Sequence, residues 1–543
     1  MINSRNLRNK LISFLFSVKR FFANKSKITA SVQSPYRYTK YYAGSDSRRP
    51  GRPSLLLRPL LIAVSALMLF SLSSCGSQLP RLSKDKPVMI TIWHHYLGEQ
   101  KVSFDNLVTE FNSTIGADSG ITVKAFSMDN TGDIHTRLLA SANREPGSSD
   151  FPEIATAYPS TAYTLYNMGK LIPLDKYMTK DELDEYIPSY IEEGRITEDS
   201  GCVIFPIAKS TETLYINYTF YKQFLDEYNK ANPSKKLNED MLETFEGIRE
   251  TAAAYFEWTD AKTPDIPNDG KALYGCDAAS NFAIVSYKQL GSDFFVVNSD
   301  STGEIDLNNP AMKTVWDSYF APMVKGHFGA YSFYRSEDTQ TGDLLMYVGS
   351  SAGAGFFPKT VTFPDNTKYD VELKVMPYPS FENGKKIAVQ QGAGAIISKS
   401  TPEKEYASVV FLKWLTEPER NIDFVLRTGY LPAKNKAIEI LRQKLPEYRS
   451  AGDINENVVK VLECTLEMMD THEFYTYKPF KASDDIRYSF EDKLLSFTQS
   501  ARNEFIEALP NDVSVDRFAD EYITVQLFDQ FLTEVRHEVL KTE

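Results

Sequence analysis

The chain has 543 residues, 42% of them hydrophobic and 24% charged, and its net charge at pH 7 is −12. Its charge is unevenly distributed: residues 1–58 hold thirteen Lys or Arg and one acid, Asp46, whereas 47 basic and 71 acidic residues follow from Cys75 onward. The acidic body excludes nucleic acid as an expected partner, because binding a phosphate backbone requires clustered Lys and Arg. Its length predicts two lobes rather than one core.

An uncharged apolar stretch, Leu60–Phe70, follows the basic segment and precedes the sequence Leu-Ser-Ser-Cys75-Gly. The stretch is too short for a permanent membrane span and suits the apolar core of a signal peptide. The basic segment stays in the cytoplasm, so the body is exported. The small residues before Cys75 resemble a bacterial lipobox, which implies cleavage there and acylation of Cys75 with palmitate-type chains. An uncleaved membrane anchor is the alternative.

Beyond Cys75, strands alternate with amphipathic helices. The patterns predict strands at 88–93, 121–126 and 152–157 and helices at 102–111, 134–142 and 161–168. This β-α-β-α-β-α order predicts an open α/β sheet with parallel strands. Ligands of such sheets bind beyond the carboxyl ends of the strands. The predicted mouth of the cleft therefore consists of residues 93–99, 127–133 and 158–161.

Three cysteines follow Cys75: Cys202, Cys276 and Cys464. They cannot form a disulfide framework, so buried free thiols are expected. The chain has no Gly-x-Ser-x-Gly, His-Glu-x-x-His, phosphate-binding lysine loop or Cys-x-x-Cys motif. We therefore expect no enzyme, no metal and no cofactor. A secreted glycoside hydrolase is one alternative, because sequence cannot reveal paired carboxylates. A structural or adhesive surface lipoprotein is another.

Several segments of the body, taken in order, resemble the carbohydrate class of extracellular solute-binding proteins, the receptors of ABC importers. They are 88–112, 150–154 with 169–175, 205–217, 342–351, 391–398, and 404–416 with 427–432. The resemblance implies an α/β, two-lobed periplasmic-binding-protein fold of type II, with a hinge and a cleft between the lobes. Within it, 205–217 resembles the first crossing between lobes and 342–351 the return crossing.

The domain boundaries follow from this resemblance. After a leader and signal peptide at 1–74 and a tether at 75–86, the first lobe is predicted to comprise 87–208 and 345–430. The second lobe is predicted to comprise 209–344 and 431–543, with a hinge near Lys209 and Leu344. We expect a monomer, lipid-anchored in the periplasm or at the cell surface, that passes a sugar or glycerophosphate to a permease.

Three short segments resemble the branch of glycerol-3-phosphate-binding proteins: Trp93-His94, Thr428–Pro432 and Ile486–Tyr488. That branch holds its ligand with serines, glycine N–H groups, a tyrosine and an arginine. The matching positions, together with three candidates from the predicted cleft mouth, are Ser210, Ser350, Ser351, Gly392, Tyr430, Arg487, Trp93, His95 and Tyr158. Residues 130–131 and Pro159 differ from the branch, which has a tyrosine and a glutamate there, so a sugar remains an open alternative. A core role for Trp93 and a surface ion pair for Arg487 also remain open.

Overall fold

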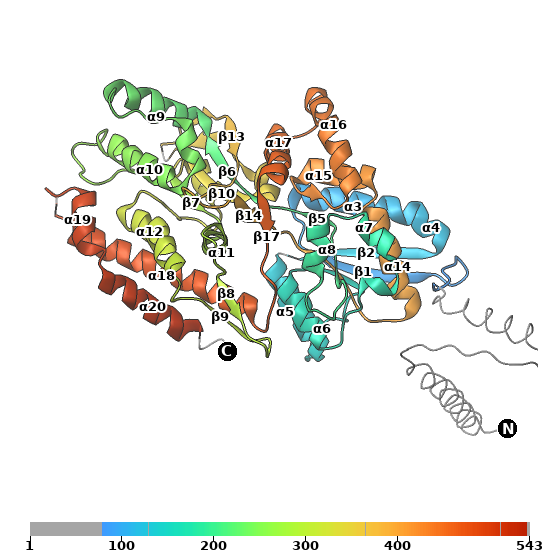
Figure 1. Cartoon of the computed structure of the whole chain (residues 1–543). Coiled ribbons are helices and arrows are strands. Elements are labelled where there is room, and N and C mark those ends of the chain that lie inside the picture. The colour runs from blue at the N-terminus through green and yellow to red at the C-terminus, as the bar shows by residue number, and fades with distance from the viewer. Residues whose placement is uncertain (1–78, 129, 364, 511, 540–543) are drawn as a thin grey trace, which may run out of the picture. The chain divides into compact units, whose positions relative to one another are not determined.

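A computed structural model describes residues 79–128, 130–363, 365–510 and 512–539. The leader, the apolar stretch Leu60–Phe70 and Cys75 lie outside the described residues, so the export signal stays a prediction. The described residues belong to one compact unit, which Figure 1 shows in colour. Within the described ranges, no helix has both the length and the apolar character needed to cross a membrane.

The first sheet has the strand order β2-β1-β3-β15-β4. Its strands are β1 (Val88–His94), β2 (Ile121–Ser127), β3 (Ile154–Ala157), β4 (Ile204–Phe205) and β15 (Gly394–Ile397). β1 pairs in parallel with β2 and with β3, which confirms the prediction of parallel strands. β15 runs antiparallel to its neighbours β3 and β4. Ile90 and Ile92 alternate along β1 and are fully buried, as expected for strands covered by helices.

Helices predicted at 102–111, 134–142 and 161–168 are present and begin earlier than expected. They are α3 (Gly98–Ser113), α5 (Thr131–Asn143) and α6 (Pro159–Asn167), and the short helix α4 (Ile115–Ser119) follows α3. Asn130 caps α5 by accepting a hydrogen bond from the Asp133 N–H, and Pro159 starts α6, where its fixed φ suits a first turn. These starting residues extend α5 and α6 beyond the apolar repeat on which the prediction rested.

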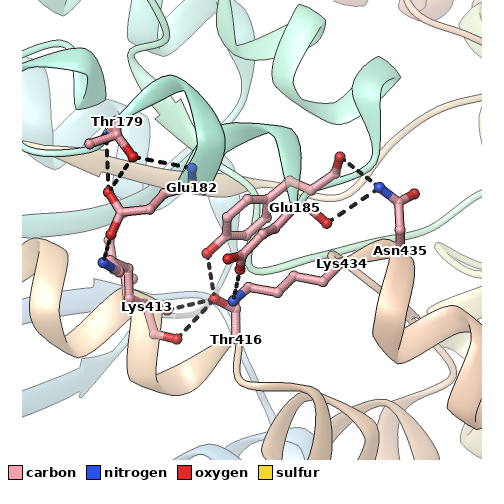
Figure 2. Close-up of polar contacts among 9 residues, drawn as sticks. Thr179, Glu182, Glu185, Lys413, Thr416, Lys434 and Asn435 are labelled. Carbon is pink, nitrogen blue, oxygen red and sulfur yellow. Dashed lines mark hydrogen bonds and ion pairs between the residues drawn. The ribbon is translucent and has the colours of Figure 1, made fainter.

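The rest of the first lobe is helical. Its helices are α7 (Lys180–Asp184), α8 (Pro188–Gly194), α14 (Pro402–Leu415), α15 (Pro418–Thr428) and α16 (Asn435–Ala451), and α3 packs against α15. Figure 2 shows how α7 is fixed to the later helices: Lys413 donates to Glu182, and Lys434 Nζ donates to Glu185 Oε2 at 2.8 Å. Tyr186 and Thr416 also share a hydrogen bond of 2.9 Å.

The second sheet has the order β13-β6-β10-β7. Its strands are β6 (Glu212–Asn217), β7 (Tyr274–Cys276), β10 (Met346–Ser350) and β13 (Leu373–Met376). The chain crosses from β4 to β6 within 205–217, so the first predicted crossing is confirmed. The second is wrong: β10 lies in segment 342–351 yet pairs with β6, so the chain stays in the second sheet. It returns between β14 (Ile387–Val389) and β15.

Two lobe boundaries change for the same reason. We predicted 345–430 for the first lobe, but β10 and β13 both pair with β6. We predicted 431–543 for the second lobe, but α16 packs against α15, and Leu441 lies in the apolar core of the first sheet. Short-range patterns could not reveal this, because strand partners and helix contacts come from distant segments. The remaining boundaries stay predictions.

Long helices surround the second sheet, and Figure 1 shows α18 to α20 in red beside α12. They are α9 (Tyr218–Ala231), α10 (Phe245–Asp260), α11 (Ala279–Gln289), α12 (Pro310–Lys325), α13 (Arg335–Thr341), α18 (Ser483–Ala508), α19 (Val515–Tyr522) and α20 (Val525–Val539), while α17 (Glu456–Thr471) packs on β13 and α16. The minor pairs are β5 (Ala208–Lys209) with β16 (Leu431–Pro432), β8 (Phe295–Val297) with β9 (Gly303–Ile305), β11 (Thr360–Thr362) with β12 (Lys368–Asp370), and β14 with β17 (Glu473–Tyr475).

Cys202, Cys276 and Cys464 are buried free thiols, as predicted.

His94 is a buried polar residue of the first lobe. Its ring lies beside Tyr96 and Phe104, and its Nε2 has no hydrogen-bond partner among the described residues. Burial lowers the pKa of His94 to about 4, from an ordinary value of 6.5. Between these two pH values the unfolded chain therefore binds a proton that folded His94 rejects. Above pH 6.5 His94 therefore does not lower the free energy of unfolding. As the pH falls from 6.5 toward 4, protonation of the unfolded chain lowers that free energy progressively.

We expect His94→Gln to reduce the loss of stability on acidification, because the substitution removes one such group. A tenfold difference in proton affinity corresponds to about 1.4 kcal/mol of unfolding free energy. Urea unfolding at pH about 7 and about 5 measures the change. Exposed His537 supplies the control, and His537→Gln should keep the wild-type slope. Equal slopes in both variants would show that His94 does not titrate in this range.

Candidate solute-binding site

A cavity of ≈ 140 Å³ lies between the two lobes, beside the return crossing. Its walls come from the starts of α5 and α6 and from α8 on the first lobe. On the second lobe they come from α11, from α18 and from the residues around β17. The sequence prediction of a cleft between two α/β lobes therefore has a physical counterpart. The cavity lies where short segments from distant parts of the chain meet.

Asp484, on α18, joins the two lobes across this cavity. The hydroxyl of Ser160 donates to Asp484 Oδ2 from the first turn of α6, and the hydroxyl of Tyr477 donates to Asp484 Oδ1 at 2.9 Å. Burial raises the pKa of Tyr158 and of Tyr477 well above the ordinary tyrosine value. Both phenols therefore stay protonated at neutral pH and can donate hydrogen bonds.

Arg487 lies one turn further along α18 and also lines the cavity. Its Nε donates to Ser280 Oγ at 3.1 Å and its Nη2 donates to Asn281 Oδ1 at 2.9 Å. The guanidinium carbon lies 5.1 Å from the centre of the Tyr488 ring, within range of a cation–π contact. These contacts leave other N–H groups of Arg487 available to a bound solute.

The return crossing is fixed by a buried ion pair. Lys209 Nζ donates to Glu193 and to the Gly392 carbonyl, and Gln390 also donates to Glu193. Lys209 is 2% exposed and Glu193 8% exposed. Gln391 pairs through its backbone with Ser210, with N–H to O distances of 2.8 and 2.9 Å. This network places the side chains of the crossing against the cavity.

The cavity combines four tyrosines with three side-chain amides and one arginine, namely Tyr158, Tyr475, Tyr477, Tyr488, Asn281, Gln390, Gln391 and Arg487. Aromatic rings offer apolar faces, while amides and phenols offer donors and acceptors in fixed directions. Such a lining suits a small solute that has both apolar faces and hydroxyl groups. Within the described ranges, no group of His, Cys, Asp and Glu is arranged to hold a metal ion.

Among the residues predicted from sequence, Tyr158 and Arg487 line the cavity. Ser210 and Gly392 are not part of its lining, but both adjoin Gln391, which is: Ser210 pairs with Gln391, and Gly392 follows it in the chain. Gly392 has φ +99°, and a Cβ there would lie 3.1 Å from the Ser210 nitrogen, so the crossing requires a residue without a side chain. The ligand-binding roles of these residues stay predictions.

The other candidates lie outside the cavity. Tyr430 and His95 contact each other, with Tyr430 Oη 3.3 Å from His95 Nε2. Ser350 ends β10, and its Oγ accepts a hydrogen bond from the Ala352 N–H. Ser351 follows the strand, and its Oγ has no partner among the described residues. Trp93 packs in an apolar cluster beneath α5, which fits the core alternative left open above. Their roles as ligand contacts stay predictions.

Sequence reasoning missed most of the lining. Asn281 and Tyr477 lie in segments that carried no recognised motif, and they reach the cavity through the packing of α11 and α18 against the crossing. Gln391 begins the recognised segment 391–398, but sequence reasoning selected its neighbour Gly392 instead. One signal was present: Thr131 and Pro159, which line the cavity, stand where this chain differs from the glycerophosphate branch. The differences therefore fall on the cavity wall.

A family profile described as "Bacterial extracellular solute-binding protein" matches residues 106–451, more than half of the chain. The chain belongs to this family. The match covers the second sheet, both crossings and every strand of the first sheet except β1, and it agrees with the resemblance read from the sequence segments. Membership accounts for the two-lobed fold and places the body outside the cytoplasm. A comparison with curated protein sequences found no match to this chain.

Solved structures of similar fold span the body. The chain is 17% identical to a cyclic α-maltosyl-1,6-maltose binding protein from Arthrobacter globiformis, with a TM-score of 0.56 and coverage of 83% of this chain and 100% of that one. It is 15% identical to UgpB from Mycobacterium tuberculosis, in complex with glycerophosphocholine, with TM-score 0.57 and coverage of 84% and 100%. A Thermus thermophilus maltotriose binding protein is 14% identical, with TM-score 0.52 and coverage of 83% and 100%. At these identities the likeness shows the fold.

We expect Ser160→Ala to favour separation of the lobes in the absence of solute, because it removes the hydrogen bond to Asp484. A hydrogen bond to a charged group contributes about 1.5–3 kcal/mol, so the open population should rise tenfold or more. Small-angle X-ray scattering measures the radius of gyration. Ser113→Ala is the control, because Ser113 is exposed and bonds only within α3. An unchanged radius in Ser160→Ala would show that Asp484 does not hold the lobes together.

Proposed function

We propose that this protein captures a small polyhydroxy solute outside the cytoplasmic membrane and delivers it to the permease of an ABC importer. Family membership supports solute binding. The observation that carries the proposal is the cavity between the lobes, whose tyrosines, amides and arginine come from both sides. A solute bound there would contact both lobes and so favour the closed arrangement, with the hinge near the crossing at Lys209.

The lining favours a sugar over a glycerophosphate. Tyrosine rings can stack on a sugar ring, and amides can bond its hydroxyls, whereas a phosphate would face Arg487 with Asp484 and Glu193 close by. Thr131 and Pro159 replace the tyrosine and glutamate of the glycerophosphate branch. Names of structural relatives include binders of both kinds, a cyclic maltosyl-maltose and glycerophosphocholine. A glycerophosphate stays the second candidate, because Arg487 can bond an anion.

Hydrogen bonds in the cavity argue against a glycoside hydrolase. That chemistry requires one carboxylic acid to give up a proton and a second carboxylate to act as base or nucleophile. Asp484 accepts from Ser160 and Tyr477, and Glu193 is paired with Lys209 and Gln390. Both carboxylates are thus engaged as acceptors. The family and its structural relatives are binding proteins, which supports binding without chemistry.

Thermal unfolding against a panel of solutes tests the proposal. A solute at a hundred times its dissociation constant should add about 2.7 kcal/mol to the free energy of unfolding. We expect a raised Tm with maltose or a longer maltodextrin. The Arg487→Ala variant should weaken binding by about 1–3 kcal/mol, the cost of a lost bond to a charged group. A shift with glycerol-3-phosphate alone would select the second candidate. No shift with any sugar or phosphate would favour the structural or adhesive alternative.

We further propose that the protein is a monomer held to the membrane by lipid on Cys75. A lipid anchor would keep the solute-loaded body within reach of its permease. We expect Cys75→Ser to abolish incorporation of radiolabelled palmitate and to move the protein from the membrane fraction to the soluble fraction. Cys202→Ser, which changes a buried thiol of the body, should keep both label and location. Label that persists in Cys75→Ser would contradict the anchor.

A further inference from the structure

Arg487 is held in the cavity wall by neutral groups. Its two side-chain acceptors, Ser280 Oγ and Asn281 Oδ1, both lie in the first turn of α11. Within the part of the chain that the structure describes, no ion pair joins Arg487 to a carboxylate. The direction of the guanidinium therefore depends on how these two neutral side chains are themselves held.

The amide of Asn281 is oriented by Glu212. Asn281 Nδ2 donates to Glu212 Oε1 at 2.7 Å and to Gln391 Oε1 at 3.2 Å. If the amide were reversed, its NH2 group would face the Arg487 guanidinium, so the hydrogen bond from Arg487 would be lost. Its oxygen would face Glu212, so the hydrogen bond to Glu212 would also be lost whenever that carboxyl is ionised. Ionised Glu212 thus selects the orientation in which Asn281 offers its oxygen to Arg487.

Glu212 occupies a position where a carboxyl group is costly. It is the first residue of β6, lies opposite Ser350 of β10, and is 3% exposed. Among the described residues, no Lys or Arg forms an ion pair with it. Burying a carboxyl without a cation destabilises a fold, and an apolar residue would avoid that cost. The acceptor that Glu212 gives to Asn281 is the interaction that an apolar residue could not replace.

We propose that Glu212 is a positioning residue of the solute site, acting through Asn281 to hold Arg487 against the cavity. Glu491 acts on Arg487 in the same way through Ser280. Its Oε2 accepts a hydrogen bond from Ser280 Oγ at 2.6 Å, and Ser280 Oγ in turn accepts one from Arg487. Two buried or half-buried carboxyls thus direct one cation through neutral intermediates. The inference rests on the proposed function, because it treats the cavity as the solute site.

Because Glu212 can gain or lose a proton, the orientation of Asn281 and Arg487 should depend on pH. Burial raises the pKa of Glu212 to about 8, and the hydrogen bond from Asn281 opposes this rise. The titratable and charged groups that face Glu212 come from β7 and the residue after it, from the segment after β13 and from α18, namely Tyr274, Cys276, Asp277, Tyr378, Arg487 and Glu491. Burial also raises the pKa of Tyr274, Cys276 and Tyr378, so these three stay neutral as the pH approaches 8.

A measurement without solute tests the inference directly. NMR of the full chain with ¹⁵N-arginine would follow the Nε–H signal of Arg487, assigned by its absence in Arg487→Lys. We expect this signal to shift with an inflection near pH 8 in the wild type. Glu212→Gln, which keeps an acceptor oxygen, should keep the signal but lose the inflection. Glu212→Leu should move or broaden the signal, because Asn281 is released.

A matched control separates this effect from the general loss of a buried carboxyl. Glu405 is 2% exposed and bonds to Lys176 and Tyr177 in the first lobe, away from the cavity. Glu405→Gln should leave the Arg487 signal and its inflection unchanged. If Glu212→Gln keeps the inflection, or if Glu405→Gln removes it, the inference is overturned. Should Glu212→Leu fail to fold, Glu212→Gln still decides the question.

Affinity gives a second, separate readout. With maltotriose and glycerol-3-phosphate as probes, Glu212→Leu should raise the Kd of whichever the wild type binds by about tenfold, and Glu212→Gln by less than about threefold. For glycerol-3-phosphate the wild-type affinity should fall above pH 8, as Glu212 gains negative charge near Arg487. Wild type that binds neither probe would count against the proposed function, whereas the NMR result would still judge Glu212. Equal Kd values in wild type and Glu212→Leu would overturn the positioning role.

Discussion

The buried ion pair between Lys209 and Glu193 is the interaction on which the site depends. Lys209 lies in the first crossing and Glu193 at the end of α8, and both are nearly inaccessible to water. Lys209 also bonds the carbonyl of Gly392 in the return crossing. One cation thus holds together the end of α8, the first crossing and the return crossing, and Gly392 lies 183 residues beyond Lys209 in the chain. Removing one partner of such a pair would leave a buried charge uncompensated, which costs about 3–5 kcal/mol.

The Lys209–Glu193 ion pair also helps to hold the cavity wall in place, because the return crossing that it fixes supplies part of that wall. Gln390 bonds Glu193, and Gln391 bonds the backbone of Ser210 and the side chain of Asn281. From Asn281 the network continues to Arg487 on α18. The structural crossing and the solute-facing arginine therefore belong to one set of hydrogen bonds. A hinge movement that disturbed the crossing would also disturb the wall of the cavity.

Carboxyl groups near the cavity have different partners and different roles. Glu193 neutralises Lys209, and Asp484 accepts from Ser160 and Tyr477 across the lobes. Among the described residues Glu212 forms no ion pair, and its carboxyl accepts a hydrogen bond from the Asn281 amide. Glu193, paired with Lys209, fixes the backbone of the crossings, and Asp484 holds the two lobes together. Glu212 orients the Asn281 amide and, through it, Arg487. The surroundings of each group, rather than its residue type, decide which of these it does.

The sequence by itself determined the α/β class, the parallel order of β1, β2 and β3, the buried thiols and the family. These features depend on local periodicity and on motifs in order, which are written along the chain. It also pointed to Tyr158 and Arg487, which lie on the cavity wall. The tertiary structure alone decided that β10 remains with β6, that α16 packs with the first lobe, and that Asn281, Gln391 and Tyr477 line one cavity with Arg487. Strand partners and cavity walls come from residues hundreds of positions apart, and no local pattern encodes which of them will touch.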